Sequence, residues 1–126
     1  MISLLLDTNA FLWYFWGSER INSIKQLIES TESEVYISAV SWWEIAIKMR
    51  TGKLTVDLGQ LRHKAEIHAF NELPITSKYI SAYLELPGLH KDPFDHMLLA
   101  QAISAPMRLI TGDALLAEYS SLVMVI

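Results

Sequence analysis

The chain contains no cysteine among its 126 residues. It therefore has no disulfide bond, no thiolate ligand for a metal ion and no cysteine nucleophile. A chain without cysteine suits a reducing compartment.

Long uninterrupted apolar runs are also missing, although 52% of the residues are hydrophobic. The N-terminal segment MISLLLDTNAFLWYFW is apolar, but Asp7, Thr8 and Asn9 interrupt it and no basic residue precedes it. A membrane-spanning helix needs about 20 apolar residues, and a signal peptide begins with basic ones. We therefore expect a soluble, cytoplasmic protein with no membrane attachment.

Positive charge is scarce. Lysine and arginine number 10 against 14 acidic residues, which leaves a net charge of −4. Proteins that hold nucleic acid by a broad basic surface have the opposite balance. If the substrate is a polyanion, positive charge has to be supplied locally, and a bound metal ion can do so.

The apolar content is ample for one buried core, and we expect a single domain over residues 1–126. Short apolar runs predict strands at Ile2–Leu6, Glu34–Ser38, Leu73–Ile75, Arg108–Thr111 and Leu122–Ile126. Helical spacing predicts helices at Glu19–Ser30, Ser41–Arg50, Asp57–Phe70, Ser77–Leu84, Pro93–Ser104 and Ala114–Glu118, with a loop or short helix at Thr8–Trp16. This alternation predicts an α/β fold with a mostly parallel central sheet and helices on both faces.

Four acidic residues follow the predicted strands or begin the predicted helices. Asp7 comes directly after the first strand and Asp113 shortly after the fourth, while Glu44 and Asp95 lie in the first turns of two helices. In such folds the working site lies outside the carboxyl ends of the strands. The topology therefore predicts that these four carboxylates gather at one edge of the sheet.

Each acid also has a purely structural explanation. Asp7 and Asp113 can cap the short segments that follow them. Glu44 can form a capping box with Ser41. The DPFD segment at 92–95 is a complete helix-start signal, with Asp92 as the cap. These roles explain the acids one at a time, but they do not explain why all four converge.

Clustered carboxylates repel one another, and a divalent cation relieves that repulsion. Oxygen ligands without cysteine or a histidine pair suit Mg²⁺ or Mn²⁺ better than zinc. Such an ion can activate water and neutralise charge on a phosphoryl group. The predicted site thus has the chemistry of phosphodiester hydrolysis.

Four sequence blocks together resemble the PIN-domain nucleases, and within them the VapC-like toxins of bacterial toxin–antitoxin pairs. The blocks are LLLDTN at 4–9, SWWEIAIK at 41–48, KDPFDHMLLAQA at 91–102 and LITGDALL at 109–116. The resemblance implies a three-layer α/β/α PIN-like domain, Mg²⁺- or Mn²⁺-dependent endoribonuclease activity on RNA, inhibition by a cognate antitoxin, and a homodimer. It also implies that Asp7, Glu44 and Asp95 are the core catalytic and metal-site acids, with Asp113 as a more variable fourth.

Other polar residues are candidates for supporting roles. The resemblance places Asn9 and Thr111 beside the site. The candidates for contact with RNA phosphates are Lys48, Arg50, Lys53 and His96. The basic residues can equally serve as cations at a helix C-terminus, and for His96 we expect a partly exposed position in the first helical turn.

The four tryptophans exceed what so small a core usually hides. We expect at least two of Trp13, Trp16, Trp42 and Trp43 in the core and the remainder at an interface with an antitoxin or a second subunit.

Two other functions remain open from the sequence. A strand-end aspartate beside Mg²⁺ would suit a phosphotransfer or phosphatase protein that uses Asp7, although Asn9 stands where a second aspartate would help. A PIN-like module that binds RNA without cutting it is the third hypothesis.

Overall fold

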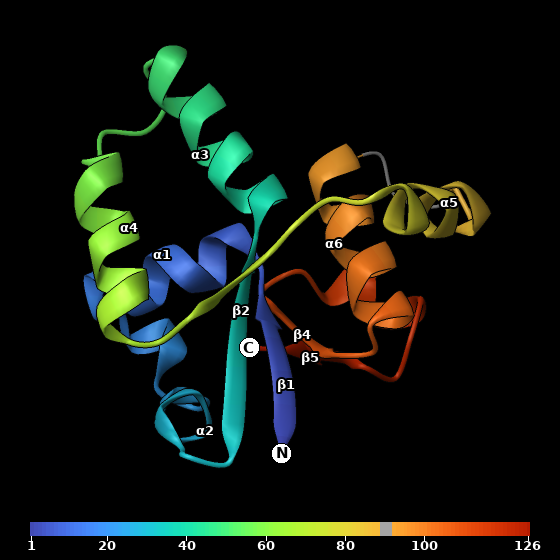
Figure 1. The fold of residues 1–126 in the computed structure, drawn as a ribbon, viewed down its shortest axis with the longest axis horizontal. Coiled ribbons are helices and arrows are strands. Elements are labelled where there is room, and N and C mark those ends of the chain that lie inside the picture. Colours follow the sequence, from blue (N-terminus) through green and yellow to red (C-terminus); the bar gives the residue numbers. More distant parts are fainter. Residues whose placement is uncertain (89–91) are drawn as a thin grey trace.

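Five parallel strands form the centre of the fold, as seen in a computed structural model that describes residues 1–88 and 92–126 (Figure 1). Their order across the sheet is β3-β2-β1-β4-β5, and every neighbouring pair is parallel. The strands are β1 (Ile2–Leu6), β2 (Ser33–Ser38), β3 (Asn71–Leu73), β4 (Arg108–Thr111) and β5 (Val123–Val125). Because β1 lies in the middle, its apolar run is covered on both faces.

Successive side chains of β1 point into two different cores. Leu4 and Leu6 belong to one apolar cluster and Leu5 to the other, and all three are fully buried. This alternation follows from the period of two in an extended strand. Fully burying one leucine side chain stabilises the fold by roughly 1.5–3 kcal/mol, so both cores depend on this short strand.

Helices cover both faces of the sheet (Figure 1). The cluster around Leu4 packs against α1 (Thr8–Trp16), α2 (Lys25–Glu29) and α4 (Leu58–Ile67), together with the 3-10 helix η1 (Glu19–Ile21). The cluster around Leu5 packs against α5 (Ser77–Glu85), α6 (Pro93–Ser104) and the 3-10 helix η2 (Ala114–Glu118). The predicted α/β class and three-layer arrangement are confirmed.

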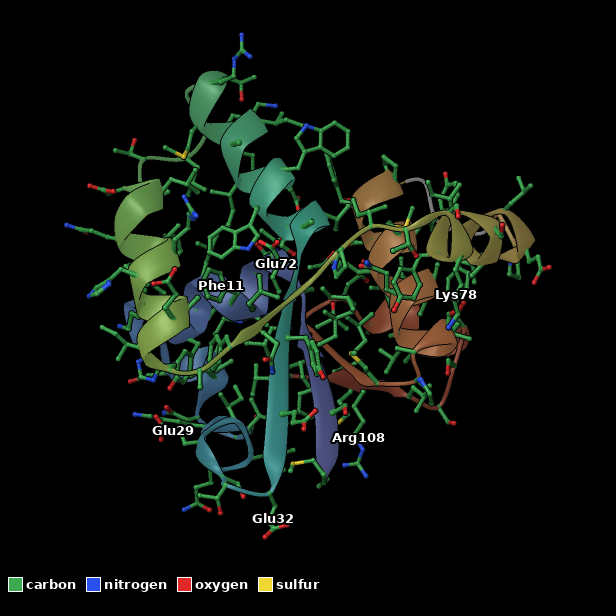
Figure 2. The ribbon with its side chains drawn as sticks, in the orientation of Figure 1. Phe11, Glu29, Glu32, Glu72, Lys78 and Arg108 are labelled. Carbon is green, nitrogen blue, oxygen red and sulfur yellow. The ribbon has the colours of Figure 1, made fainter. Side chains whose placement is uncertain are left out.

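Helix α3 (Ala39–Arg50) continues beyond the carboxyl end of β2, away from the sheet (Figure 1). Ser38 caps it by accepting a hydrogen bond from the amide of Val40 at 3.1 Å. Trp42 anchors it through an edge contact with Phe11, with ring centroids 5.3 Å apart. Phe11, labelled in Figure 2, belongs to α1 and is buried in the core around Leu4.

Several predicted elements differ in their bounds from the structure. The helix expected at Asp57–Phe70 is α4 at Leu58–Ile67, which ends before a turn at 68–69, and the strand expected at Leu122–Ile126 is β5 at Val123–Val125. The single helix expected at Glu19–Ser30 is instead η1 followed by α2, because a turn at 22–24 separates them. The strand expected at Leu73–Ile75 is β3 at 71–73, since Pro74 has no amide hydrogen to continue the pairing. Helix α3 begins at Ala39 rather than Ser41, because Ser38 provides the cap.

Two tryptophans pack against the core, as expected, and two are exposed. Trp13 and Trp42 pack against the core around Leu4, whereas Trp16 and Trp43 are 52% and 58% exposed. In residues 1–88 and 92–126, no helix combines the length and apolar character needed to cross a bilayer.

Candidate active site

A polar pocket of about 360 Å³ opens where β1 and β4 end. From the central strand β1, the sheet extends through β2 and β3 on one side and through β4 and β5 on the other. Such a reversal of strand order leaves a crevice at the carboxyl ends of the strands. The polar and aromatic side chains that line the pocket are Asp7, Asn9, Trp13, Arg20, Asp95 and Asp113.

Asp7 is the most deeply placed of these acids, with a side chain that is only 5% exposed. It caps α1, since its Oδ1 accepts a hydrogen bond of 2.8 Å from the amide of Ala10. Burial raises the pKa of Asp7, and the negative charges of Glu44 and Asp113 raise it further, while hydrogen bonds from Thr111 and Ala10 lower it. The balance is a carboxyl group that favours a proton or a nearby cation.

Thr111 connects two of the acids. Its buried hydroxyl donates to the carboxylate of Asp7 and accepts a 3.0 Å hydrogen bond from the amide of Asp113. Asp113 in turn caps η2 by accepting from the amide of Leu115 at 3.0 Å. One threonine at the end of β4 therefore fixes the positions of both neighbouring aspartates.

Asp95 reaches the pocket from the first turn of α6. Asp92 caps this helix, as predicted, and its Oδ1 accepts from the amides of Phe94 at 2.9 Å and Asp95 at 3.3 Å. Buried Gln101 ties α6 to the sheet, because its Oε1 accepts a 2.6 Å hydrogen bond from the hydroxyl of Ser38. The helix start and this buried contact together place Asp95 at the pocket.

Glu44 lies outside this lining, in a hydrogen-bonded network on α3. Its Oε1 accepts from the hydroxyl of Thr8 at 2.5 Å, and its Oε2 pairs with Lys48 Nζ at 3.0 Å. The Thr8 hydroxyl also lies 3.0 Å from that of Ser41. The predicted capping box is wrong, because Ser41 is inside the helix rather than at its start.

The predicted RNA-contact residues occupy different environments. Lys48 is engaged with Glu44, whereas Arg50 and Lys53 are exposed at and just beyond the end of α3. The expectation of a partly exposed His96 is wrong: its side chain is 8% exposed and lies near Tyr83 and Tyr119, with its Nε2 3.1 Å from the Tyr119 hydroxyl. As placed, His96 is an interior residue.

The donors at the pocket suit a hard divalent cation. They are carboxylate oxygens from Asp7, Asp95 and Asp113 and an amide oxygen from Asn9. Among residues 1–88 and 92–126, no three acidic or histidine side chains are close enough to form a ready-made metal site. Mg²⁺ does not require one, since it usually takes one or two carboxylates and completes its shell with water and substrate phosphate.

Sequence reasoning missed three residues in and around the site. Thr8 holds Glu44, and Trp13 and Arg20 line the pocket beside the aspartates. Trp13 lies four positions after Asn9 on a helix, so their shared face was a usable signal. The sequence carries no such signal for Arg20, because the approach of its side chain to the pocket depends on how η1 packs against α1.

Residues 4–122 match the family model of the PIN domain. The chain is 25% identical over 122 residues to ribonuclease VapC22 of Mycobacterium tuberculosis (strain ATCC 25618 / H37Rv), covering 94% of this chain and 93% of that protein. The family match spans nearly all of the sequence, including each of the four acidic positions.

Solved structures share the same fold at low sequence identity. VapBC2 from Rickettsia felis, crystallised with a DNA fragment from its promoter, aligns with a TM-score of 0.72 and 17% identity over 97% of this chain and 96% of that chain. A toxin–antitoxin complex from Klebsiella pneumoniae aligns with a TM-score of 0.68 and 21% identity over 96% and 95%. At these identities the likeness concerns the fold.

Proposed function

The chain belongs to the PIN-domain family, and from this membership and the pocket we propose that it is a metal-dependent endoribonuclease, the toxin of a toxin–antitoxin pair. The observation that carries the proposal is the meeting of Asp7, Asp95 and Asp113 at one pocket where the strand order reverses. These three come from separate segments of the chain. Neither the caps that Asp7 and Asp113 provide nor the first-turn position of Asp95 requires them to meet.

Each residue of the site takes a defined role in this proposal. Asp7, Asp95 and Asp113 line the pocket that takes Mg²⁺ or Mn²⁺, one or two of them as direct ligands and the rest through water, with Asn9 beside them. Thr111 orients two of the aspartates. Glu44, held by Thr8, orients the attacking water and supports the ion directly or through water. The bound ion would supply positive charge toward phosphate oxygens and lower the pKa of bound water.

The proposed reaction is an in-line attack by water on the phosphorus of an RNA phosphodiester. The new bond joins the water oxygen to phosphorus and the bond to the 3′ oxygen breaks. The products are a 5′-phosphate and a 3′-hydroxyl, with the proton of the attacking water released to solvent and the leaving oxygen protonated.

The proposed partners follow from relatives and from surface residues. The relative named a ribonuclease supports RNA as substrate, and the fold neighbours crystallised as toxin–antitoxin complexes support an antitoxin partner. Trp43 is 58% exposed and packs edge-on against Phe94, and Trp16 is 52% exposed. We assign these exposed indoles to contacts with an antitoxin or with a second copy of the chain in a homodimer. The chain itself is proposed to be a single PIN-like domain that acts in the cytoplasm.

Cleavage of a panel of structured and single-stranded RNAs tests the proposal. The assays use Mg²⁺, Mn²⁺ or a chelator, and they compare the parent protein with Asp7→Asn and with Glu32→Gln. Glu32 is an exposed acid in the turn just before β2, at the opposite end of that strand from its carboxyl end (Figure 2). We expect metal-dependent cutting that Asp7→Asn abolishes and Glu32→Gln retains.

Two outcomes would contradict this proposal, the first its site and the second its activity. Full activity of Asp7→Asn would remove Asp7 from the site. RNA binding by a folded, Mn²⁺-binding parent that cuts nothing in the panel would favour the non-catalytic PIN-like module.

A further inference from the structure

An aromatic–cation pair forms one wall of the aspartate pocket. The guanidinium carbon of Arg20 lies 3.9 Å from the centroid of the Trp13 ring, and both side chains line the pocket with Asp7, Asp95 and Asp113. Trp13 comes from α1 and Arg20 from η1, so two separate segments build this wall. In a chain of net charge −4, an arginine held at the edge of an acidic pocket calls for an explanation.

The backbone at Gly112 accommodates this pair. A Cβ atom at Gly112 would lie 2.6 Å from Trp13 Cη2 and 3.3 Å from Arg20 Nη2. The first distance is too short for a real side chain, so the glycine lets the indole lie directly against the backbone between Thr111 and Asp113. The position of Arg20 is thus linked, through Trp13, to the segment that carries two residues of the site.

Stacking determines which part of the guanidinium is available. An arginine above an indole contacts it through its flat face, which leaves the N–H donors in its plane directed outward. Those donors match two oxygens of a phosphate group in a bidentate arrangement. The stack also restricts the side chain before any ligand binds, which lowers the entropy lost on binding.

We propose that Arg20, positioned by Trp13, binds a phosphate of the RNA strand at the aspartate pocket. The inference rests on the proposed function, because it takes RNA as the ligand. It also answers the shortage of positive charge: a metal ion accounts for the phosphate being cleaved, and Arg20 supplies a fixed cation for an adjacent phosphate. The competing role is that of a counterion that only neutralises the aspartates, and it predicts the opposite effect on RNA binding.

The salt dependence of RNA binding separates these roles. The parent for this test is Asp7→Asn, which prevents cutting, and the probe is a short fluorescein-labelled single-stranded RNA of randomised sequence, followed by anisotropy over a range of KCl concentrations. Arg20→Gln and Arg20→Lys are made in that parent. The matched control is Arg62→Gln, which removes an exposed arginine from α4, outside the pocket.

Loss of one phosphate contact reduces the slope of log binding constant against log salt by about 0.7 for a single strand. We expect that reduction for Arg20→Gln and no change for Arg62→Gln. Arg20→Lys should retain the slope, because the charge remains, but bind RNA more weakly, because the planar fork is gone. An unchanged slope in Arg20→Gln, equal losses in both glutamine variants, or tighter binding by Arg20→Gln would overturn the proposal.

The role of Trp13 needs a readout that a structural defect would not produce. Trp13→Leu and the double variant Trp13→Leu/Arg20→Gln complete a cycle with the parent and Arg20→Gln. If the indole acts through Arg20, Trp13→Leu should weaken RNA binding less in the Arg20→Gln background than it does in the parent. Additive effects in variants that melt like the parent would contradict positioning by Trp13.

Failure of this inference can be told apart from failure of the proposed function. If the unmodified protein cuts RNA and Arg20→Gln leaves the salt slope unchanged, the nuclease assignment is supported and the phosphate contact of Arg20 is contradicted. If Arg20→Gln reduces the slope and the unmodified protein cuts no RNA, the phosphate contact of Arg20 is supported and the nuclease assignment is contradicted. Absence of salt-dependent binding by the parent would overturn the contact directly.

Discussion

The four candidate acids of the site occupy two different environments. Asp7, Asp95 and Asp113 line an open pocket, while Glu44 is held by the hydroxyl of Thr8 and the ammonium of Lys48. The negative charge of Glu44 already has protein partners, whereas burial raises the pKa of Asp7 and two neighbouring acids add to the effect. A cation in the pocket would therefore relieve an unfavourable charge on Asp7.

This contrast separates two functions that the acids were expected to share. The pocket residues are suited to hold an ion, because their carboxylates line one open pocket. Glu44 is suited to hold a defined orientation, because two hydrogen-bonded partners restrict its rotamers. The following predictions test that division, starting with the largest expected effect.

Exchanging one acid of the DPFD segment should remove activity and exchanging the other should not. Asp95→Asn removes a carboxylate from the pocket, and we expect kcat/KM for RNA cleavage to fall roughly a thousandfold or more. Asp92→Asn is the matched control, because asparagine caps a helix about as well as aspartate. Equal loss in both variants would mean that the segment matters for the helix and not for an ion.

Thr8→Val should reduce cleavage by a smaller factor. The substitution keeps the shape of a buried side chain and removes the hydroxyl that holds Glu44 Oε1. Losing a partner that orients a site carboxylate typically costs about 10–100-fold. Thr8→Ser retains the hydroxyl and should recover most of the activity. A Thr8→Ser variant as slow as Thr8→Val would point to packing instead.

Asp7→Asn should stabilise the metal-free protein at neutral pH. The folded-state pKa of Asp7 lies above its ordinary value of 3.8, so its charged form is less stable in the folded protein than in the unfolded chain. That penalty is absent below the ordinary value, grows as pH rises from that value to the folded-state pKa, and is constant above it. We therefore expect Asp7→Asn to have a higher Tm than the parent at neutral pH.

Thermal melts of Asp7→Asn and the parent across the acidic range would check this sign. The advantage of the variant should disappear as pH falls below 3.8. An advantage that persists unchanged at acidic pH would have to come from packing or capping and not from the charge of Asp7.

Lys48→Gln should have the smallest effect. The pair with Glu44 spans one helical turn, and the lysine side chain is 38% exposed. Such pairs contribute about 0.3–0.5 kcal/mol, so chemical denaturation should detect only a slight loss of stability. A loss of more than 1 kcal/mol would mean that Lys48 secures Glu44 far more strongly than an exposed pair can.

Much of the fold could be predicted because its signals are local. The apolar runs of β1 and β4 and the DPFD start of α6 each mark an element by themselves, and their alternation implies a parallel sheet. The segment at 19–30 was predicted wrongly because apolar residues at helical spacing continue through a turn at 22–24. Periodicity records which side chains are buried, and a 3-10 helix followed by a short helix can bury the same ones.

The site was predictable only where topology alone positions a residue. Asp7 and Asp113 lie at strand ends, so a parallel sheet brings them to one edge whatever the details of packing. The partners of Glu44 and the stacking of Arg20 on Trp13 depend on distances between helices, which sequence spacing does not contain. The burial of His96 escaped prediction for the same reason, since Tyr83 and Tyr119 belong to other elements.

The most direct test of the central claim is a Mn²⁺ titration followed by electron paramagnetic resonance in the parent, Asp7→Asn and Glu44→Gln. The account predicts that the parent binds Mn²⁺, that Asp7→Asn loses this binding, and that Glu44→Gln retains it with reduced affinity. Loss of Mn²⁺ binding in Glu44→Gln with full binding in Asp7→Asn would contradict the account, because it would place the ion at the α3 network instead of the aspartate pocket.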